Sequence, residues 1–282
     1  MPQATVEIQH LKKIAQEIRV DIIRMLTEAG SGHPGGSLSA TEIVTALLFH
    51  KMRHRADNPF WLDRDRFVLS KGHCCPVLYA GLAKAGYFPA AELLTLRKLG
   101  SRLQGHPYPG EPGARLPGVE AAAGSLGQGL SIAIGMALAG RLARKTYRVY
   151  ALLGDGECQA GQVWEAAMLA PKYELDHLCA VVDRNGIQND DFVERTLALE
   201  PFRAKWEAFG WHVIHIDGHD IRAVLEALEQ AEAVTGRPTV IIADTVKGKG
   251  VSFMENNPDW HGKAPNREQG ERAIQEILAA PL

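Results

Sequence analysis

Short apolar runs alternate with longer amphipathic stretches along most of the chain. Five runs rich in aliphatic residues, bounded by polar or glycine positions, predict buried strands. Between them, apolar residues recur every three or four positions, which is the spacing of a helix with one buried face. Strands that alternate with helices form parallel sheets, so the pattern predicts an α/β fold with a mostly parallel sheet and helices on both faces. The predicted strands cover residues 66–70, 147–153, 178–183, 212–216 and 239–246.

The helix boundaries follow from capping residues and glycines. A long amphipathic helix is expected over residues 6–29, with Gly30 ending it. The polar, glycine-rich residues 31–36 predict a loop. Ser39 and Glu42 have the spacing of a capping box, which predicts that the next helix begins there and runs to about residue 49. Further helices are expected over residues 75–85, 90–99, 162–172, 202–209, 221–233 and 267–278, and an alanine-rich helix follows Gly129 and ends near residue 144.

Length and composition restrict the class of protein. The 282 residues are 46% hydrophobic and 23% charged, which is ordinary for a globular protein, and we expect one domain over residues 1–282 with 247–282 as its C-terminal extension. A net charge of −2 gives no electrostatic reason to bind nucleic acid or an anionic membrane. Residues 1–29 lack the apolar core of a signal peptide, and the weakly polar run 126–140 is too short to span a bilayer. The four cysteines have no metal-binding spacing, so we expect a cytoplasmic protein with reduced thiols.

Asp155 lies between two glycines directly after a predicted strand, and Asn185 follows the next predicted strand. The helix predicted between them makes this a βαβ unit, which places both side chains at the carboxyl ends of parallel strands. Carboxylate and amide oxygens, with a backbone carbonyl, suit a Mg²⁺ ion that holds a diphosphate, and Gly154 and Gly156 let the main chain approach a phosphate closely. The alternative is an ordinary strand-to-helix turn capped by Asp155, but Asn185 at the next strand end favours the metal site.

Four of the 11 histidines lie next to glycine in predicted loops: His33, His73, His106 and His261. This arrangement favours a common cleft over four unrelated surface histidines. Imidazoles beside a hydroxylated substrate can donate hydrogen bonds and move protons near neutral pH, whereas their spacing does not match a zinc site. The stretch Lys247-Gly248-Lys249-Gly250 leaves two interpretations open, a further anion contact or a basic exposed turn.

Several of these motifs occur in an order that is typical of one enzyme family. They are Ser31-Gly32-His33-Pro34-Gly35, Ser70-Lys71-Gly72-His73, Gly105-His106-Pro107, Ser125-Leu126-Gly127-Gln128-Gly129, Gly154-Asp155-Gly156 and Lys247-Gly248-Lys249-Gly250. The chain resembles, from end to end, the N-terminal, diphosphate-binding section of transketolase, of the kind that is encoded as a separate subunit.

The resemblance implies the thiamine diphosphate-binding fold and a transferase that moves a two-carbon ketol unit from a ketose phosphate to an aldose phosphate. Its cofactors are thiamine diphosphate and Mg²⁺ or Ca²⁺. Asp155, Asn185 and the carbonyl of Ile187 match the family's metal ligands. The positions that match cofactor contacts are His73, Gly127, Gly154, Gly156 and Asn185, and those that match substrate or proton-transfer positions are His33, His106, His261 and Glu165.

The chain departs from the family pattern at two places. Ala160 stands where the family usually has a glutamate of a proton network that links two cofactors, and residues 188–191 differ from the usual sequence beyond the metal ligands. Ala160 therefore leaves open a specialised carboligase whose donor is not a pentose phosphate. A non-catalytic subunit that has kept the fold is a further alternative, which the retention of Asp155, Asn185 and the four histidines opposes.

Only 21 residues follow His261, too few for another α/β domain. The resemblance therefore implies a partner subunit that carries the pyrimidine-binding and C-terminal sections. The expected assembly is a heterotetramer with two copies of each chain, in which sugar phosphate substrates bind at the interface between subunits.

Overall fold

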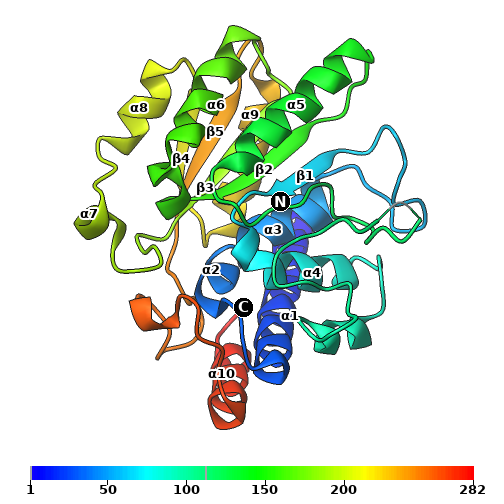
Figure 1. The fold of residues 1–282 in the computed structure, drawn as a ribbon, viewed down its shortest axis with the longest axis vertical. Coiled ribbons are helices and arrows are strands. Elements are labelled where there is room, and N and C mark those ends of the chain that lie inside the picture. The colour runs from blue at the N-terminus through cyan, green and yellow to red at the C-terminus, as the bar shows by residue number, and fades with distance from the viewer. Residues whose placement is uncertain (1, 112) are drawn as a thin grey trace.

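Five strands form one parallel sheet in the part of the chain that this computed structural model describes, residues 2–111 and 113–282 (Figure 1). The order across the sheet is β1-β2-β3-β5-β4, and each neighbouring pair is parallel. The predicted α/β fold is therefore confirmed, and each strand begins and ends within two residues of its predicted bounds. The strands are β1 (Arg66–Leu69), β2 (Val149–Gly154), β3 (Leu178–Arg184), β4 (His212–Asp217) and β5 (Thr239–Asp244).

Side chains alternate between two apolar cores along the central strands, as the pleat requires. Tyr150 and Leu152 of β2 pack into one core, whereas Ala151 and Leu153 pack into the other. Burial of each aliphatic side chain contributes about 1.5–3 kcal/mol, so both cores stabilise the sheet between them. Helices on the first side are α1 (Pro2–Ala29), α3 (Thr41–Ala46), α4 (Cys75–Lys84), α9 (Ile221–Ala233) and α10 (Arg267–Ala279), and those on the second are α5 (Gln128–Leu142), α6 (Gly161–Lys172) and α8 (Phe202–Ala208) (Figure 1).

Helix α6 illustrates how the sequence pattern determines packing. Its buried residues are Val163, Ala166, Ala167 and Ala170, the same face that the three- and four-residue spacing predicts. Helix α10 packs against α1, which places residues near both ends of the chain side by side. The division into one domain over residues 1–282, with 247–282 as its C-terminal extension, stays a prediction. The contact between α1 and α10 supports it.

Two predictions near the N-terminus are wrong. Residues 31–36 are not all loop, because α2 (Pro34–Ser39) begins at Pro34 and all six of its residues are buried. A proline at the first helical position is already in helical geometry, which offsets the cost of the glycines that follow. Ser39 does not cap the next helix: the cap position is Ala40, and the Ser39 hydroxyl donates to Asp183 at 2.6 Å instead.

The helix predicted over 90–99 is also wrong in extent. Residues Ala90–Thr95 form a 3₁₀ helix, and Arg97 has φ +61°, a left-handed conformation that ends any helix. The short helix α7 (Val193–Thr196) has no counterpart in the prediction. The remaining helical turns are η1 (Leu47–Lys51), η2 (Gly72–Cys74), η4 (Gly156–Gln159) and η5 (Pro258–Trp260).

Among the residues that the structure describes, no helix combines the length and the apolar character that crossing a bilayer requires.

Candidate active site

Strands β2 and β3 end side by side, with Gly154 paired to Asp183. Asp155 and Asn185 come directly after these ends, and both are buried. The two carboxylate oxygens of Asp155 accept backbone N–H groups, Oδ1 from Gly156 at 2.8 Å and Oδ2 from Gly186 at 2.6 Å. The structure therefore brings the predicted Asp155–Asn185 pair to one edge of the sheet.

The oxygens at this edge fit a hard divalent cation. Burial raises the pKa of Asp155 to about 6, and the negative charge of Asp183 acts in the same direction, so a bound cation would relieve an unfavourable charge. Asp155, Asn185 and Ile187 line one cavity of about 90 Å³. In residues 2–111 and 113–282, no three His, Cys, Asp or Glu side chains gather as ligands, so an ion here would bind the Asp155 carboxylate together with amide, carbonyl and phosphate oxygens, as Mg²⁺ can.

Lys247 lies at the predicted metal site. Its ammonium donates to the Ile187 carbonyl at 2.8 Å and contacts His261 Nδ1 at 2.7 Å. A cation on the Ile187 oxygen would therefore compete with Lys247. Lys247 is 2% exposed, so an exposed basic turn is wrong for this residue, and burial lowers its pKa to about 8. A buried ammonium at this edge can also bind a diphosphate.

Asp183 is the centre of a buried polar network that the sequence reading missed. Its carboxylate accepts from Ser39 at 2.6 Å, from Asn185 Nδ2 at 3.0 Å, and from Lys71 and Thr245. Burial alone would raise the pKa of Asp183, but the adjacent Lys71 ammonium outweighs it and lowers that pKa. Because Asn185 donates through Nδ2, its Oδ1 is held on the other side of the amide, where it accepts the Ile187 N–H at 3.2 Å. The signal in the sequence is an aspartate inside an apolar strand.

Glu157 is a second buried carboxylate that the sequence reading missed. It is 3% exposed and accepts from Gly127 N–H at 2.9 Å, from Gly154 N–H at 3.1 Å and from the Ser70 hydroxyl. These donors belong to three separate segments, so Glu157 joins the loops that surround the diphosphate position. An acidic residue directly after Gly154-Asp155-Gly156 is the signal that could have identified it.

The structure brings the four predicted histidines together. The ring of His33 lies 5.2 Å from that of His73, 5.5 Å from that of His261 and 6.4 Å from that of His106, and His73 and His261 are 5.2 Å apart. The four loops that carry them therefore converge, and His73 and His261 line the same cavity as Asp155. Nδ1 of His33 is buried without a hydrogen-bond partner among the described residues, so it is free to bind a ligand.

All four imidazoles are held in the neutral form. Burial lowers the pKa of His33 to about 4, with Arg97 adding to the effect, and lowers the pKa of His261 to about 3, with Lys247 adding to the effect. Burial also lowers the pKa values of His73 and His106. Neutral rings carry one donor and one acceptor nitrogen, so near pH 7 they can orient hydroxyl groups through hydrogen bonds in both directions.

The remaining predicted residues are divided between the site and the surface. Gly127 has φ +90°, which favours glycine, and precedes α5 at the edge of the cluster. A Cβ at Gly156 would lie 2.6 Å from the Gln188 side chain, so this glycine permits close approach of the 188–191 loop. Glu165 lies outside the cluster, exposed on α6, and its role between subunits stays a prediction.

The sequence matches the family described as "Transketolase, thiamine diphosphate binding domain" over residues 10–279. It is 45% identical over 274 residues to human transketolase, covering 97% of this chain but 43% of that protein, so it spans less than half the length of that relative. The chain also aligns along nearly the whole length of two shorter proteins. These are the 6-deoxy-6-sulfo-D-fructose transketolase subunit SqwG of Clostridium sp. (strain MSTE9), 42% identical with 98% of each chain covered, and an apulose-4-phosphate transketolase subunit of Phocaeicola vulgatus, 38% identical with 96% and 95% covered.

The fold is likewise similar to solved structures. Transketolase from Leishmania mexicana superposes with a TM-score of 0.89 at 31% sequence identity, over 95% of this chain and 41% of that one. The parallel sheet of this chain therefore has the same architecture as the matching part of that transketolase.

Proposed function

Since the chain belongs to the transketolase family, as a thiamine diphosphate-binding domain, we propose that it is the N-terminal subunit of a two-subunit transketolase. In this proposal the complex transfers a two-carbon ketol unit from a ketose phosphate to an aldose phosphate. The observation that carries the proposal is the convergence of four neutral histidines on the buried edge formed by Asp155 and Asn185.

The residues divide the work between holding the cofactor and handling the substrate. Asp155, Asn185 and the Ile187 carbonyl would hold Mg²⁺ or Ca²⁺ once Lys247 has released the Ile187 oxygen, and the loops joined by Glu157 would surround the diphosphate. Thiamine diphosphate, when bound, supplies the electron sink for cleavage of a bond next to a carbonyl. The buried Lys247 adds positive charge at the diphosphate.

The histidines orient the donor. His33 offers an unpartnered Nδ1, and the neutral rings of His106 and His261 lie 6.4 and 5.5 Å from its ring. Neutral imidazoles can donate to one hydroxyl while accepting from another, which fixes the donor sugar relative to the cofactor.

A partner chain completes the site in this proposal. The cavity at the strand ends is about 90 Å³, well below the roughly 300–1,000 Å³ of sites that enclose a cofactor, so a second surface must cover it. The two relatives of matching length are named as transketolase subunits. We therefore include a C-terminal subunit, in a heterotetramer with two copies of each chain. The cysteines of the described chain are unpaired, which supports the cytoplasmic location that we also propose.

The replacement Asp155→Ala tests the proposal. Titration calorimetry with thiamine diphosphate and Mg²⁺ is expected to show at least tenfold weaker binding to the variant, because the only carboxylate among the proposed ligands is lost. In the complex assembled with its partner, ketol transfer should fall in parallel. Unchanged activity of the assembled variant would instead favour a non-catalytic role, and full transfer by the purified chain alone would contradict the need for a partner.

A specialised donor is the second candidate function. The two relatives that match along their whole length are named for 6-deoxy-6-sulfo-D-fructose and apulose 4-phosphate, and Ala160 departs from the family's glutamate. Turnover of these two donors and of a pentose phosphate by the assembled complex separates the candidates. A kcat/KM at least tenfold higher for a donor other than the pentose phosphate would establish the specialised function.

A further inference from the structure

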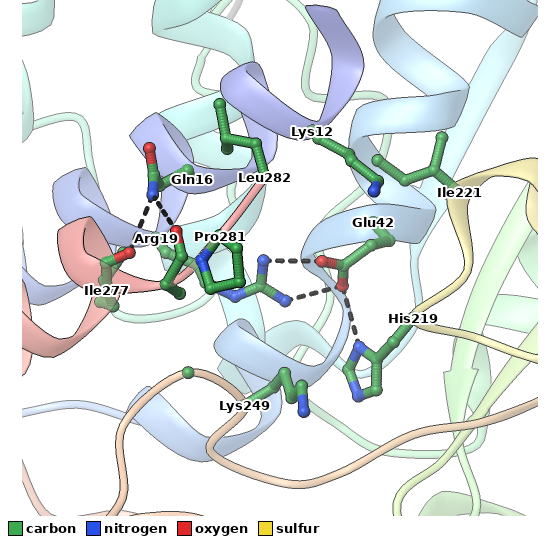
Figure 2. Close-up of a pocket in the computed structure, with 12 residues that line it drawn as sticks. Lys12, Gln16, Arg19, Glu42, His219, Ile221, Lys249, Ile277, Pro281 and Leu282 are labelled. Atoms are coloured by element: carbon green, nitrogen blue, oxygen red, sulfur yellow. Dashed lines mark hydrogen bonds and ion pairs between the residues drawn. The ribbon is translucent and has the colours of Figure 1, made fainter. Parts of the chain in front are cut away.

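A second cavity of about 260 Å³ lies beside the Lys247-Gly248-Lys249-Gly250 turn, where α1, α3 and the end of α10 meet (Figure 2). It shares no lining residue with the cavity at the strand ends. The two are nevertheless adjacent through the turn, because Lys247 lines the first and Lys249 lines the second.

The one acidic side chain that lines this cavity is fully engaged by neighbours in the described chain. Glu42 forms an ion pair with Arg19, with N–O distances of 2.6 and 2.7 Å, and also accepts from His219 Nδ1 at 3.0 Å (Figure 2). His219 Nε2 accepts the Val246 N–H at 2.8 Å, so the ring proton is on Nδ1 and the ring is neutral. The carboxylate of Glu42 therefore compensates Arg19 and forms no ion pair with Lys12 or Lys249.

Three donors in the cavity lack a strong internal partner. Within residues 2–111 and 113–282, Lys12 forms no ion pair and the buried Nε of Arg19 has no hydrogen-bond partner. Lys249 contacts only Glu255, at 3.6 Å and largely in solvent. In Figure 2, Lys12 and Lys249 lie on opposite sides of the Arg19–Glu42 pair. Two ammonium groups and one buried N–H thus surround a space in which Glu42 is the only side-chain carboxylate of the described residues.

We propose that this cavity binds a phosphate group, either as free phosphate or as the head of a small phosphorylated metabolite. Two lysines balance the charge of a dianion, and the Arg19 Nε–H supplies the directed hydrogen bond that the phosphate oxygens need. Ile277 and Pro281 form an apolar wall beside these donors, against which the carbon skeleton of a phosphate ester packs. The volume exceeds what a phosphate ion alone occupies.

Occupancy of the cavity is coupled to the strand-end site through the turn. Gly248 N–H donates to the Gly35 carbonyl at 3.0 Å, Lys249 N–H donates to the Val246 carbonyl at 3.1 Å, and Val246 is held by His219, so the backbone of the turn is fixed. The Lys249 side chain lines the second cavity, so an anion bound there adds a contact that stabilises the turn and, with it, the position of Lys247. Only this coupling rests on the proposed function, since the phosphate site itself does not require thiamine diphosphate.

Titration calorimetry with inorganic phosphate tests the site. The chain is loaded with thiamine diphosphate and Mg²⁺ to block the strand-end site, and ionic strength is kept constant with chloride. The double variant Lys12→Gln/Lys249→Gln is expected to bind phosphate at least tenfold more weakly, whereas Lys13→Gln, at the exposed neighbouring position on α1, should bind like the parent. Equal affinity of the parent and the double variant would overturn the proposal. If the double variant does not fold, Lys12→Gln alone at its half-exposed position replaces it, and unchanged affinity overturns the proposal equally.

Two further measurements define the ligand and the coupling. Tighter binding of glycerol 3-phosphate than of phosphate identifies a phosphorylated metabolite, and weaker binding identifies free phosphate. Saturating phosphate is expected to raise the affinity for thiamine diphosphate about fivefold in the parent and not in the double variant; no gain in the parent overturns the coupling. If the complex assembled with its partner binds no thiamine diphosphate, the proposed function fails. Phosphate binding to Lys247→Met, and its loss on adding the double replacement, then still decide the site.

Discussion

Asp183 is the buried carboxylate that balances the charge of Lys71 beside the candidate active site. It is fully buried, and it is the counter-ion of the equally buried Lys71 as well as the acceptor for Asn185. We expect Asp183→Asn to lower the free energy of unfolding by about 3–5 kcal/mol, because an unpaired ammonium would remain in the core. Urea unfolding measures this loss.

Two matched variants show whether the unpaired charge is the cause. Asp244→Asn removes an exposed carboxylate from the end of the neighbouring strand, where it pairs with Arg184 at 3.1 Å, and should cost no more than about 1 kcal/mol. Replacing both members of the buried pair, as Lys71→Met/Asp183→Asn, should restore part of the stability. A double variant less stable than Asp183→Asn would contradict this explanation.

The histidine cluster should make stability depend on pH. His33 has a pKa of about 4 in the folded chain and near 6.5 when unfolded, so between these values the unfolded chain binds a proton that the folded chain does not. The free energy of unfolding is therefore expected to fall as the pH decreases from 6.5 to 4. Urea unfolding at several pH values measures this slope, and imidazole chemical shifts give the midpoint for His33 directly.

Arg97 supplies a test of the cause. Its positive charge lowers the pKa values of His33 and His106 in addition to burial, so Arg97→Met should raise both midpoints. Arg102→Met is the matched control, because Arg102 pairs with Glu92 and has no such effect on the cluster. A midpoint for His33 near 6.5 in the parent would show that the ring is not held neutral.

At the scale of elements, Glu157 determines how the loops at the strand ends are joined. Its two oxygens accept from Gly127 and Gly154, which lie before α5 and at the end of β2. In Glu157→Gln an amide NH₂ would face one of these N–H donors. We expect a loss of about 1–3 kcal/mol in the free energy of unfolding, measured by urea, together with weaker thiamine diphosphate binding.

Glu165→Gln is the control for this prediction. Glu165 is exposed on the following helix, α6, so its replacement in the isolated chain should change stability by no more than about 0.5 kcal/mol. Equal effects of the two replacements would show that the loops are not held by Glu157.

The elements that the sequence predicted well are those with a strong apolar period. The spacing of apolar residues predicted the buried face of α6 and the five strands, because side chains that share a face recur at a fixed interval along the chain. Helix α2 was missed because its glycines oppose a helix locally, whereas its complete burial favours one. Ser39 has the residue type of a cap, but a buried carboxylate 144 positions away binds its hydroxyl instead.

At the scale of the whole molecule, the outer faces of α5 and α6 expose apolar side chains. Leu142 is 86% exposed, Met168 is 56% exposed and Tyr173, which follows α6, is 45% exposed. Such a surface is costly in water and is typical of an interface. We expect Leu142→Glu/Met168→Glu to fold normally but to weaken assembly of the proposed complex at least tenfold, as measured by light scattering.

Leu99→Glu is the control for assembly. Leu99 is fully exposed and follows Lys98, which pairs with Glu28 of α1, on the other side of the sheet from α5 and α6, so its replacement should leave assembly unchanged. Assembly that resists the double replacement would place the interface elsewhere on the molecule.

The sequence by itself determined the α/β fold, the strand ends that carry Asp155 and Asn185, and the set of histidine loops, because these depend on local period and on the order of motifs. Only the tertiary structure decided which charges are buried together. Lys71, Glu157, Asp183 and Lys247 are ordinary charged residues in the sequence, and each has its role because distant segments exclude water around it. Burial changes the pKa of a group and the strength of its hydrogen bonds, and burial is a property of the packed molecule rather than of any stretch of the chain.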